Sequence, residues 1–353
     1  MKIVEGKNIK RLKLVKLHKN IKCFAKFINM KKNSLIVSKQ GTKINDLIFK
    51  ELIKRGYSLE GNTRVWNIAD SKLWYLTPEQ AQAFLDLEKS EGYQKEVIQK
   101  EIDLINKHIK EITEGIGKKP LNIIDLGCGD GKKAIIFIEQ LKEKIKLRYC
   151  PIDISSYMVE KASNRIKNIY ADEIVELKWN ISDFENLENI SLLLRQEEFT
   201  KNLNLLLGNT LGNFEINELL YEIRMSMTDG DMLLIGNGLD NSKIEEMLKS
   251  YNDEFNNQFL IKIIKQLGLN ETDVEFGVRF NNSRVEIYYT LKNECKISFL
   301  DKSVIFNKGD QIIVAVSYKY NKDDFMSYLK MYFGDVRMFV SPDSSYALAL
   351  CKK

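Results

Sequence analysis

The stretch IDLGCGDGK, residues 124–132, decides the fold class of this 353-residue chain. An apolar run, Leu121–Leu126, leads into it, and a segment with helical periodicity, Lys133–Leu141, follows it. A buried strand that ends in a glycine-rich turn lets a ligand approach the backbone and aims the amides of the next helix at that ligand. The sequence therefore predicts a strand–turn–helix unit with a ligand site at the turn.

The glycine spacing indicates which ligand the turn would hold. Gly127, Gly129 and Gly131 follow the pattern G-x-G-x-G, and Lys132 stands where a dinucleotide-binding turn would have its third glycine. Asp125, two residues before the first glycine, suits a ligand with a positively charged amino group better than a pyrophosphate. We assign these five residues to a cofactor site, although the turn taken alone is equally consistent with a structural role.

Beyond the turn, apolar runs alternate with amphipathic helical segments. This alternation predicts a largely parallel sheet covered by helices on both faces, to which a C-terminal hairpin returns as the antiparallel edge. The expected strands are residues 121–126, 147–152, 174–179, 203–207, 232–235, 336–340 and 346–350.

Further ligand-facing residues follow the second, third and fourth predicted strands. Asp153 ends the second strand, where an acid in a doubly wound sheet accepts hydrogen bonds from ribose hydroxyls. Asp183 and Phe184 follow the third strand and offer an acid for an adenine amino group and a ring to stack on it. Gly208 opens the loop after the fourth strand, where we expect substrate to meet cofactor. These features predict one nucleoside site at the carboxyl edge of the sheet.

The rest of the chain divides into further segments by its pattern. Residues 1–70 read as a basic accessory module, and residues 71–118 as a helical segment that closes the site. From about Tyr251 to Tyr320 the runs are β-like without long helices, which predicts an inserted substrate-recognition subdomain with a small antiparallel sheet. Residues 119–250 and 321–353 then form a Rossmann-like α/β core.

Composition excludes several classes of protein. Residues 1–55 hold 16 Lys/Arg against 3 Asp/Glu, so peptide or nucleic-acid contact through this basic arm is an open alternative. The sequence shows no secretory signal and no membrane span. Its five cysteines are scattered and contain no CxxC pair, so we expect a cytoplasmic protein. The two histidines, His18 and His108, are far apart, so we expect neither a metal site nor a histidine-based triad.

The order of motifs resembles the histidine Nα-methyltransferase family, which includes the ergothioneine-pathway enzyme and dimethylallyltryptophan N-methyltransferases. The motifs are DLGCGDGKK, PIDIS, LLLGNTLGNF, YND from Tyr251, SRVEIYY from Ser283 and VSYKY from Val316. The resemblance covers roughly residues 85–353. It implies a class I methyltransferase fold and S-adenosylmethionine (SAM) as cofactor.

The resemblance also implies roles for residues outside the glycine turn. Asn213 resembles the asparagine that holds the substrate's amino-acid head group, and Tyr251 the tyrosine that contacts its carboxylate. Tyr93 is similar to a tyrosine near the amine, which makes Asn213 and Tyr93 the implied catalytic pair. Ile287 and Ser317 match residues beside the substrate side chain.

One departure from the family pattern concerns the substrate. Two residues before the matching serine, the histidine enzymes carry a glutamate that recognises imidazole, and this chain has Ala315. The leading hypothesis is therefore N-methylation of a small amino-acid-like molecule that need not be histidine. The alternatives are methylation of a peptide, protein or RNA delivered by the basic module, and a catalytically silent SAM-binding scaffold. The sequence leaves the oligomeric state open.

Overall fold

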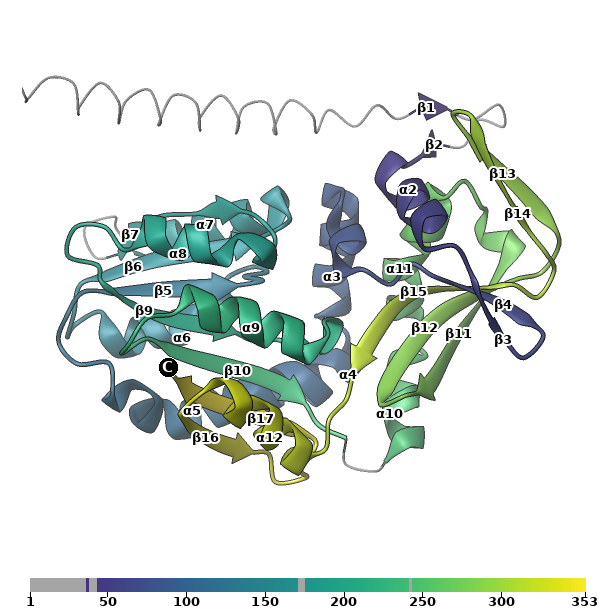
Figure 1. Cartoon of the computed structure of the whole chain (residues 1–353). Helices are drawn as coiled ribbons and strands as arrows, with labels where there is room; N and C mark the ends of the chain where they lie inside the picture. Colours follow the sequence, from purple (N-terminus) through teal and green to yellow (C-terminus); the bar gives the residue numbers. More distant parts are fainter. Residues whose placement is uncertain (1–35, 38–42, 171–174, 241–242) are drawn as a thin grey trace, which may run out of the picture.

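A computed structural model describes residues 36–37, 43–170, 175–240 and 243–353 (Figure 1). Most of the basic arm predicted at residues 1–55 lies outside the described residues. In the described part of the chain, no helix is both long enough and apolar enough to cross a membrane.

The larger of the two main sheets forms the core predicted from the glycine turn. Its strand order is β16-β17-β10-β9-β5-β6-β7, with β8 also paired to β6. Pairing is parallel from β10 to β7, while β17 runs antiparallel to β10 and β16 forms the outer edge. The strands are β5 (Leu121–Leu126), β6 (Leu147–Asp153), β7 (Val175–Leu177), β8 (Asn180–Ile181), β9 (Lys201–Leu206), β10 (Met232–Gly238), β16 (Asp335–Val340) and β17 (Tyr346–Lys352). The predicted Rossmann-like α/β core, with the C-terminal hairpin as its antiparallel edge, is confirmed.

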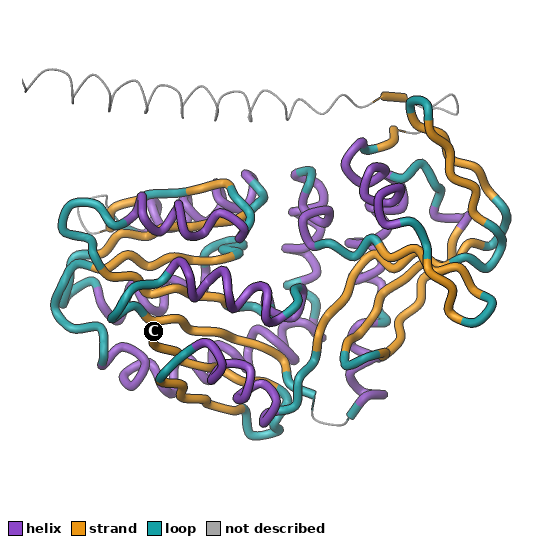
Figure 2. The backbone as a smooth tube through the Cα atoms, viewed as in Figure 1, coloured by secondary structure: helices purple, strands orange, loops and turns teal. Residues whose placement is uncertain are grey.

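Helices cover both faces of this sheet, as the apolar strands require (Figure 2). Ile123 packs into the core formed with α5, α6 and α7, and its neighbour Ile124 packs into the core on the opposite face, formed with α8, α9 and α12. Burial of each such side chain contributes about 1.5–3 kcal/mol. The helices are α5 (Gln99–Glu114), α6 (Lys132–Leu141), α7 (Ser156–Ile169), α8 (Leu187–Leu194), α9 (Ile216–Ser226) and α12 (Lys322–Tyr332).

A second sheet joins segments that are far apart in the sequence. Its order is β11-β12-β15-β4-β3, and β15 pairs with β4 in parallel, with Gln311 opposite Val65. Two of its strands thus come from the predicted accessory module and three from the predicted insertion, so the sheet is mixed rather than purely antiparallel. The strands are β3 (Ser58–Glu60), β4 (Thr63–Asn67), β11 (Val274–Asn281), β12 (Arg284–Leu291) and β15 (Gln311–Tyr318), and two short pairs, β1 (Ile36–Val37) with β2 (Lys43–Ile44) and β13 (Cys295–Phe299) with β14 (Lys302–Phe306), stand apart.

Among the remaining helical segments, α3 lies between the two sheets, whereas α2 and α10 lie beside the second sheet (Figure 1). Thr77 caps the start of α3 through its side chain, as its sequence Thr-Pro-Glu predicts. The sequence indicated the β-like runs of residues 251–320 but not the helix α11 that precedes them, whose apolar face carries Phe259, Leu260 and Ile264. The segments are α2 (Asp46–Arg55), η1 (Ser71–Tyr75), α3 (Pro78–Leu87), α4 (Glu91–Tyr93), the π-turn η2 (Gln94–Ile98), α10 (Ile244–Tyr251) and α11 (Glu254–Gln266).

One buried carboxylate ties the core to its loops. Glu101 on α5 has no exposed surface, and its Oε1 accepts a hydrogen bond from the Tyr346 hydroxyl at 2.7 Å. A Cβ on Gly236 in β10 would lie 1.8 Å from that same oxygen. Only glycine at 236 therefore leaves room for the carboxylate.

Substitution of Gly236 tests this packing. We expect Gly236→Ala to lower the free energy of unfolding by at least about 2 kcal/mol, because the buried carboxylate must move away from its partners. Gly92→Ala is the matched control: a Cβ at Gly92, in α4, meets nothing within 4 Å, so its effect should be neutral or a gain of up to about 1 kcal/mol. Chemical denaturation measures both, and equal stability of the two variants would contradict this account.

Candidate functional site

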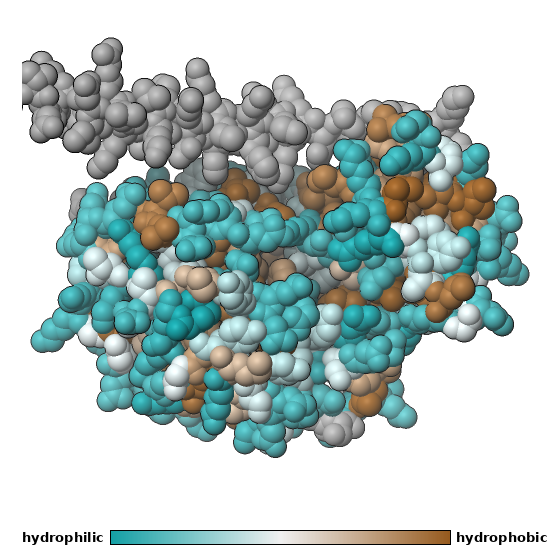
Figure 3. Space-filling model, in the orientation of Figure 1, coloured by the Kyte–Doolittle hydropathy of each residue, from teal (hydrophilic) through white to brown (hydrophobic). Residues whose placement is uncertain are grey.

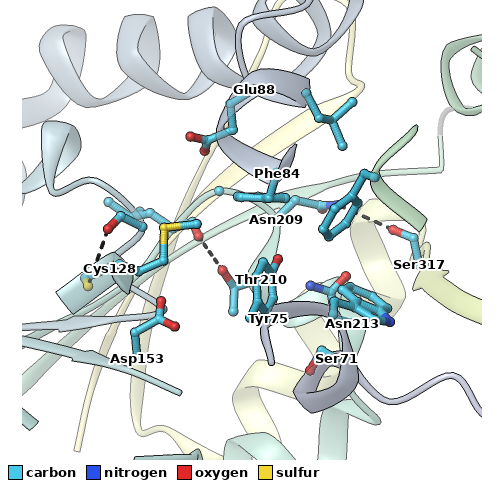
Figure 4. Close-up of a pocket in the computed structure, with 18 of the residues that line it drawn as sticks. Ser71, Tyr75, Phe84, Glu88, Cys128, Asp153, Asn209, Thr210, Asn213 and Ser317 are labelled. Atoms are coloured by element: carbon cyan, nitrogen blue, oxygen red, sulfur yellow. Dashed lines mark hydrogen bonds between the residues drawn. The ribbon is translucent and has the colours of Figure 1, made fainter. Parts of the chain in front are cut away.

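A cavity of about 410 Å³ opens where the carboxyl ends of β5, β6 and β9 face the second sheet. The space-filling view shows a hollow on this face between the two halves of the molecule (Figure 3). In the close-up, Asp153 and Cys128 lie at one end of the cavity and Asn213 and Ser317 at the other, with Tyr75 and Phe84 between them (Figure 4). The cavity thus has a core-sheet end and a second-sheet end.

The glycine turn forms part of the core-sheet end. Gly127, Gly129 and Gly131 all have positive φ, of 69°, 51° and 76°, a conformation that glycine adopts without strain. Gly127 and Gly129 line the cavity, but Gly131 does not. A Cβ on Gly131 would lie 3.1 Å from Ala162, so this glycine allows α6 and α7 to pack closely.

One buried and one half-buried carboxyl group, those of Asp125 and Asp153, face this turn. Asp125 accepts a hydrogen bond from the Tyr149 hydroxyl at 2.7 Å, and burial raises its pKa to about 7. Asp153 accepts a hydrogen bond from the backbone N–H of Ser155 at 2.9 Å. Burial raises the pKa of Asp153 to about 6, although backbone amides, including that of Gly129, oppose the shift. Both residues line the cavity and can accept hydrogen bonds from a ligand.

The other predicted cofactor residues also line the cavity, though two carry ion pairs. Asp183 lies 3.2 Å from Lys72 Nζ of η1, and Lys132 lies 2.8 Å from Asp130. Phe184 packs against Phe214 with 5.4 Å between ring centroids, which leaves an aromatic surface at this end. Gly208 also lines the cavity.

The residues implied by the family resemblance gather at the second-sheet end. Asn213, Tyr251, Ile287, Ser317 and Tyr93 all line the same cavity, although they come from five separate elements. The Tyr251 hydroxyl donates to Ser317 Oγ at 3.0 Å, and the Tyr93 hydroxyl donates to the carbonyl of Gly208 at 3.3 Å. Burial, aided by the charge of Glu88, raises the pKa of Tyr93 well above its usual value, so Tyr93 stays a neutral phenol.

Sequence reasoning missed several residues of this cavity. Glu88, just after α3, lines the wall, and burial raises the pKa of its carboxyl, with Lys133 opposing the shift. Tyr75, Phe84 and Phe259 form an aromatic cluster with centroid distances of 5.4–5.9 Å. The spacing around Glu88 gave no sign that this acid faces a cavity rather than solvent.

The residues present at the core-sheet end fit a nucleoside with an amino-acid tail. The buried Asp125 and the half-buried Asp153 can accept hydrogen bonds from hydroxyl and amino groups. A Cβ on Gly129 would meet nothing within 4 Å, so the turn leaves open space beside Asp153. These are the groups that ribose hydroxyls and an ammonium require.

The family model that matches the chain agrees with this interpretation. A family model described as "Histidine-specific methyltransferase, SAM-dependent" matches residues 83–353, and no curated protein matches the chain. Among solved structures, the chain is similar to a putative methyltransferase from Thermobifida fusca YX, at 10% identity over 78% of this chain and 94% of that one, with a TM-score of 0.43. It is also similar to the PH0226 protein from Pyrococcus horikoshii OT3, at 13% identity over 75% and 93% of the two chains, with a TM-score of 0.41. A DhpI-SAM-HEP complex matches at 10% identity over 78% and 99%, with a TM-score of 0.36.

The role of Asp153 can be tested by binding. We expect Asp153→Ala to weaken the affinity for S-adenosylhomocysteine at least about tenfold at pH 8, because a charged hydrogen-bond acceptor is lost. Asp335→Ala, which removes an exposed acid paired with Lys352, should leave the affinity unchanged. Isothermal titration calorimetry measures both.

The same measurement has a predicted pH dependence. Because the pKa of Asp153 is about 6, its carboxylate form persists above that pH, and wild-type affinity should fall as the pH drops from 8 to 5.5. The ratio of the affinities at pH 8 and pH 5.5 should be smaller in Asp153→Ala than in wild type. An unchanged affinity in the variant would remove Asp153 from the site.

Proposed function

Because the chain belongs to the family of histidine-specific, SAM-dependent methyltransferases, we propose that it N-methylates the amine of an amino-acid-like small molecule. The supporting observation is the single cavity that joins Asp125 and Asp153 at one end to Asn213 and Tyr251 at the other. A cofactor held at the first end and an amine held at the second would meet beside Gly208.

The chemistry requires positioning more than acid–base machinery. When bound, SAM would supply an electrophilic methyl group on a positively charged sulfur, and the residues of the cavity would have to present a neutral amine in line with the methyl–sulfur bond that breaks. Holding the reacting atoms about 3–3.5 Å apart and aligned contributes on the order of 7–11 kcal/mol to catalysis. In this proposal Asp153 and Asp125 fix the cofactor, while Asn213 and Tyr251 fix the acceptor.

The acceptor amine must reach the methyl group without its extra proton. Tyr93 is a neutral phenol whose proton is engaged by the Gly208 carbonyl, so its oxygen is free to accept a hydrogen bond from the amine. Glu88 lines the same cavity, and its raised pKa suits a group that takes up a proton. Tyr93 would thus orient the amine, and Glu88 would assist its deprotonation.

The second-sheet end also bears on the acceptor's side chain. Ala315 and Ile287 lie opposite each other on β15 and β12, and both line the cavity with Phe259 and Leu260. This wall is apolar, and the family's imidazole-recognising glutamate is replaced by Ala315. The apolar wall favours an acceptor with an uncharged, apolar or aromatic side chain over one with an imidazole.

Alternatives from the sequence receive less support. Delivery of a peptide, protein or RNA would depend on the basic arm, most of which lies outside the described residues. Membership of an enzyme family makes a silent scaffold the poorer explanation of a cavity lined by five buried or half-buried acids.

A direct test uses methyl-labelled SAM and a mixture of amino acids, simple amines and short peptides. Mass spectrometry should find the label on the amine of one or more free amino acids, with apolar or aromatic ones ahead of histidine. Label confined to peptides, or to oxygen or carbon, would contradict the proposal.

Substitution of Asn213 separates acceptor binding from cofactor binding. We expect Asn213→Ala to lower kcat/KM for the acceptor about 10–100-fold, because a head-group hydrogen bond is lost, while affinity for S-adenosylhomocysteine changes less than about twofold. Asn189→Ala, an exposed position on α8, is the control and should leave both values unchanged. Weaker cofactor binding without an effect on kcat/KM for the acceptor would contradict the assignment of Asn213 to acceptor binding.

A further inference from the structure

Lys319 is a buried lysine that directly follows β15 and stands behind the second-sheet end of the cavity. Its exposed fraction is 5%, and its Nζ donates to Ser317 Oγ at 3.1 Å. The same Nζ lies 5.4 Å from the ring centroid of Tyr251. Lys319 itself does not line the cavity, but Ser317 and Tyr251 do.

No carboxylate of the described residues forms an ion pair with Lys319, in contrast to the half-buried Lys133, which pairs with the buried Glu101. Lys319 Nζ lies beside the Ser317 hydroxyl, the Tyr251 ring and Gly238, and Asn209 bonds to the same Ser317 hydroxyl. None of these groups is a carboxylate. A buried ammonium without a countercharge is costly, and an anion that enters next to it reduces that cost.

The charge of Lys319 reaches the cavity through Tyr251 and Ser317. Burial opposes ionisation of Tyr251, yet Lys319, with Ser317 and Asn209, lowers the pKa of its hydroxyl below the usual value. Ser317 Oγ accepts from both the Tyr251 hydroxyl and Lys319 Nζ, so its own proton is left to donate, and the neighbouring ammonium makes it a stronger hydrogen-bond donor toward an anion in the cavity. Asn209 also ties this cluster to the core sheet, since its Oδ1 accepts the Gly238 N–H at 2.8 Å.

We propose that Lys319 is a positioning residue that makes the second-sheet end of the cavity selective for acceptors with a free carboxylate beside the amine. It acts through Tyr251 and Ser317, which contact it and line the cavity. The inference rests on the proposed N-methylation and narrows it: α-amino acids are accepted, whereas their carboxamides, their decarboxylated amines and peptide N-termini are rejected.

The test compares an amino acid that the wild-type protein methylates with its carboxamide and its decarboxylated amine. For wild type, kcat/KM should be at least about 50-fold lower for the two analogues, mainly through KM. In Lys319→Met, kcat/KM for the amino acid should fall at least about tenfold, while that for the carboxamide changes less than about threefold. Lys319→Arg keeps the charge and should recover part of the discrimination, and Lys330→Met, on exposed α12, should match wild type.

A second readout does not depend on turnover. Ultraviolet difference titration of each protein against its own Tyr251→Phe partner reports the ionisation of Tyr251, which should move to higher pH in Lys319→Met. Calorimetric affinity for S-adenosylhomocysteine confirms that the variants keep the cofactor end intact.

The outcomes separate the two proposals. Methylation of amino acid and carboxamide with similar kcat/KM, or loss of both activities to the same degree in Lys319→Met, overturns the role of Lys319 and leaves the proposed function standing. Absence of any amine methylation overturns the proposed function, and the inference falls with it.

Discussion

The buried carboxylate of Glu101 is the interaction on which the arrangement of the site depends. It accepts the Gly208 N–H at 2.9 and 3.1 Å, and Lys133 Nζ lies 2.7 Å away. With the Tyr346 hydroxyl, these partners bring together α5, α6, β17 and the loop after β9. An ionised group without contact with water persists only when its hydrogen-bonding capacity is filled in this way. The loop that carries Gly208 is therefore fixed rather than free.

The same loop holds the core-sheet end and the second-sheet end of the cavity in a fixed relative position. Asn209 adopts a left-handed conformation, with φ of 63°, and its side chain reaches both Gly238 N in the core sheet and, at 3.4 Å, Ser317 Oγ in the second sheet. Residues Thr210–Asn213 then form a short helical turn that carries Asn213 into the cavity. A loop anchored on one sheet and bonded to the other would hold the methyl donor and the proposed amine acceptor in a fixed relative position.

Much of the core could be predicted because its signals are local. The glycine turn and the apolar run before it gave β5 with the bounds the structure shows, and Thr77-Pro78-Glu79 gave the start of α3. The second sheet was harder, because the pairing of β4 with β15 joins residues about 250 positions apart and leaves no periodic trace.

Buried charges were the least predictable part of the site. Glu88, Glu101 and Lys319 look like surface residues in the sequence, where acids and lysines are common. Only the folded chain shows that they face the cavity or the residues that support it. Gly131 is the opposite case, because the glycine motif assigned it to the cofactor site, whereas in the structure the absence of its side chain allows α6 to pack closely on α7.

The most direct test of the account is a crystal structure with S-adenosylhomocysteine and a methylated amino acid acceptor bound together. The account predicts the ribose hydroxyls against Asp153 and the acceptor nitrogen between Asn213 and Tyr93, pointing at the sulfur across the space the methyl group would fill. A nucleoside bound away from the ends of β5 and β6, or an amine turned away from the sulfur, would contradict it.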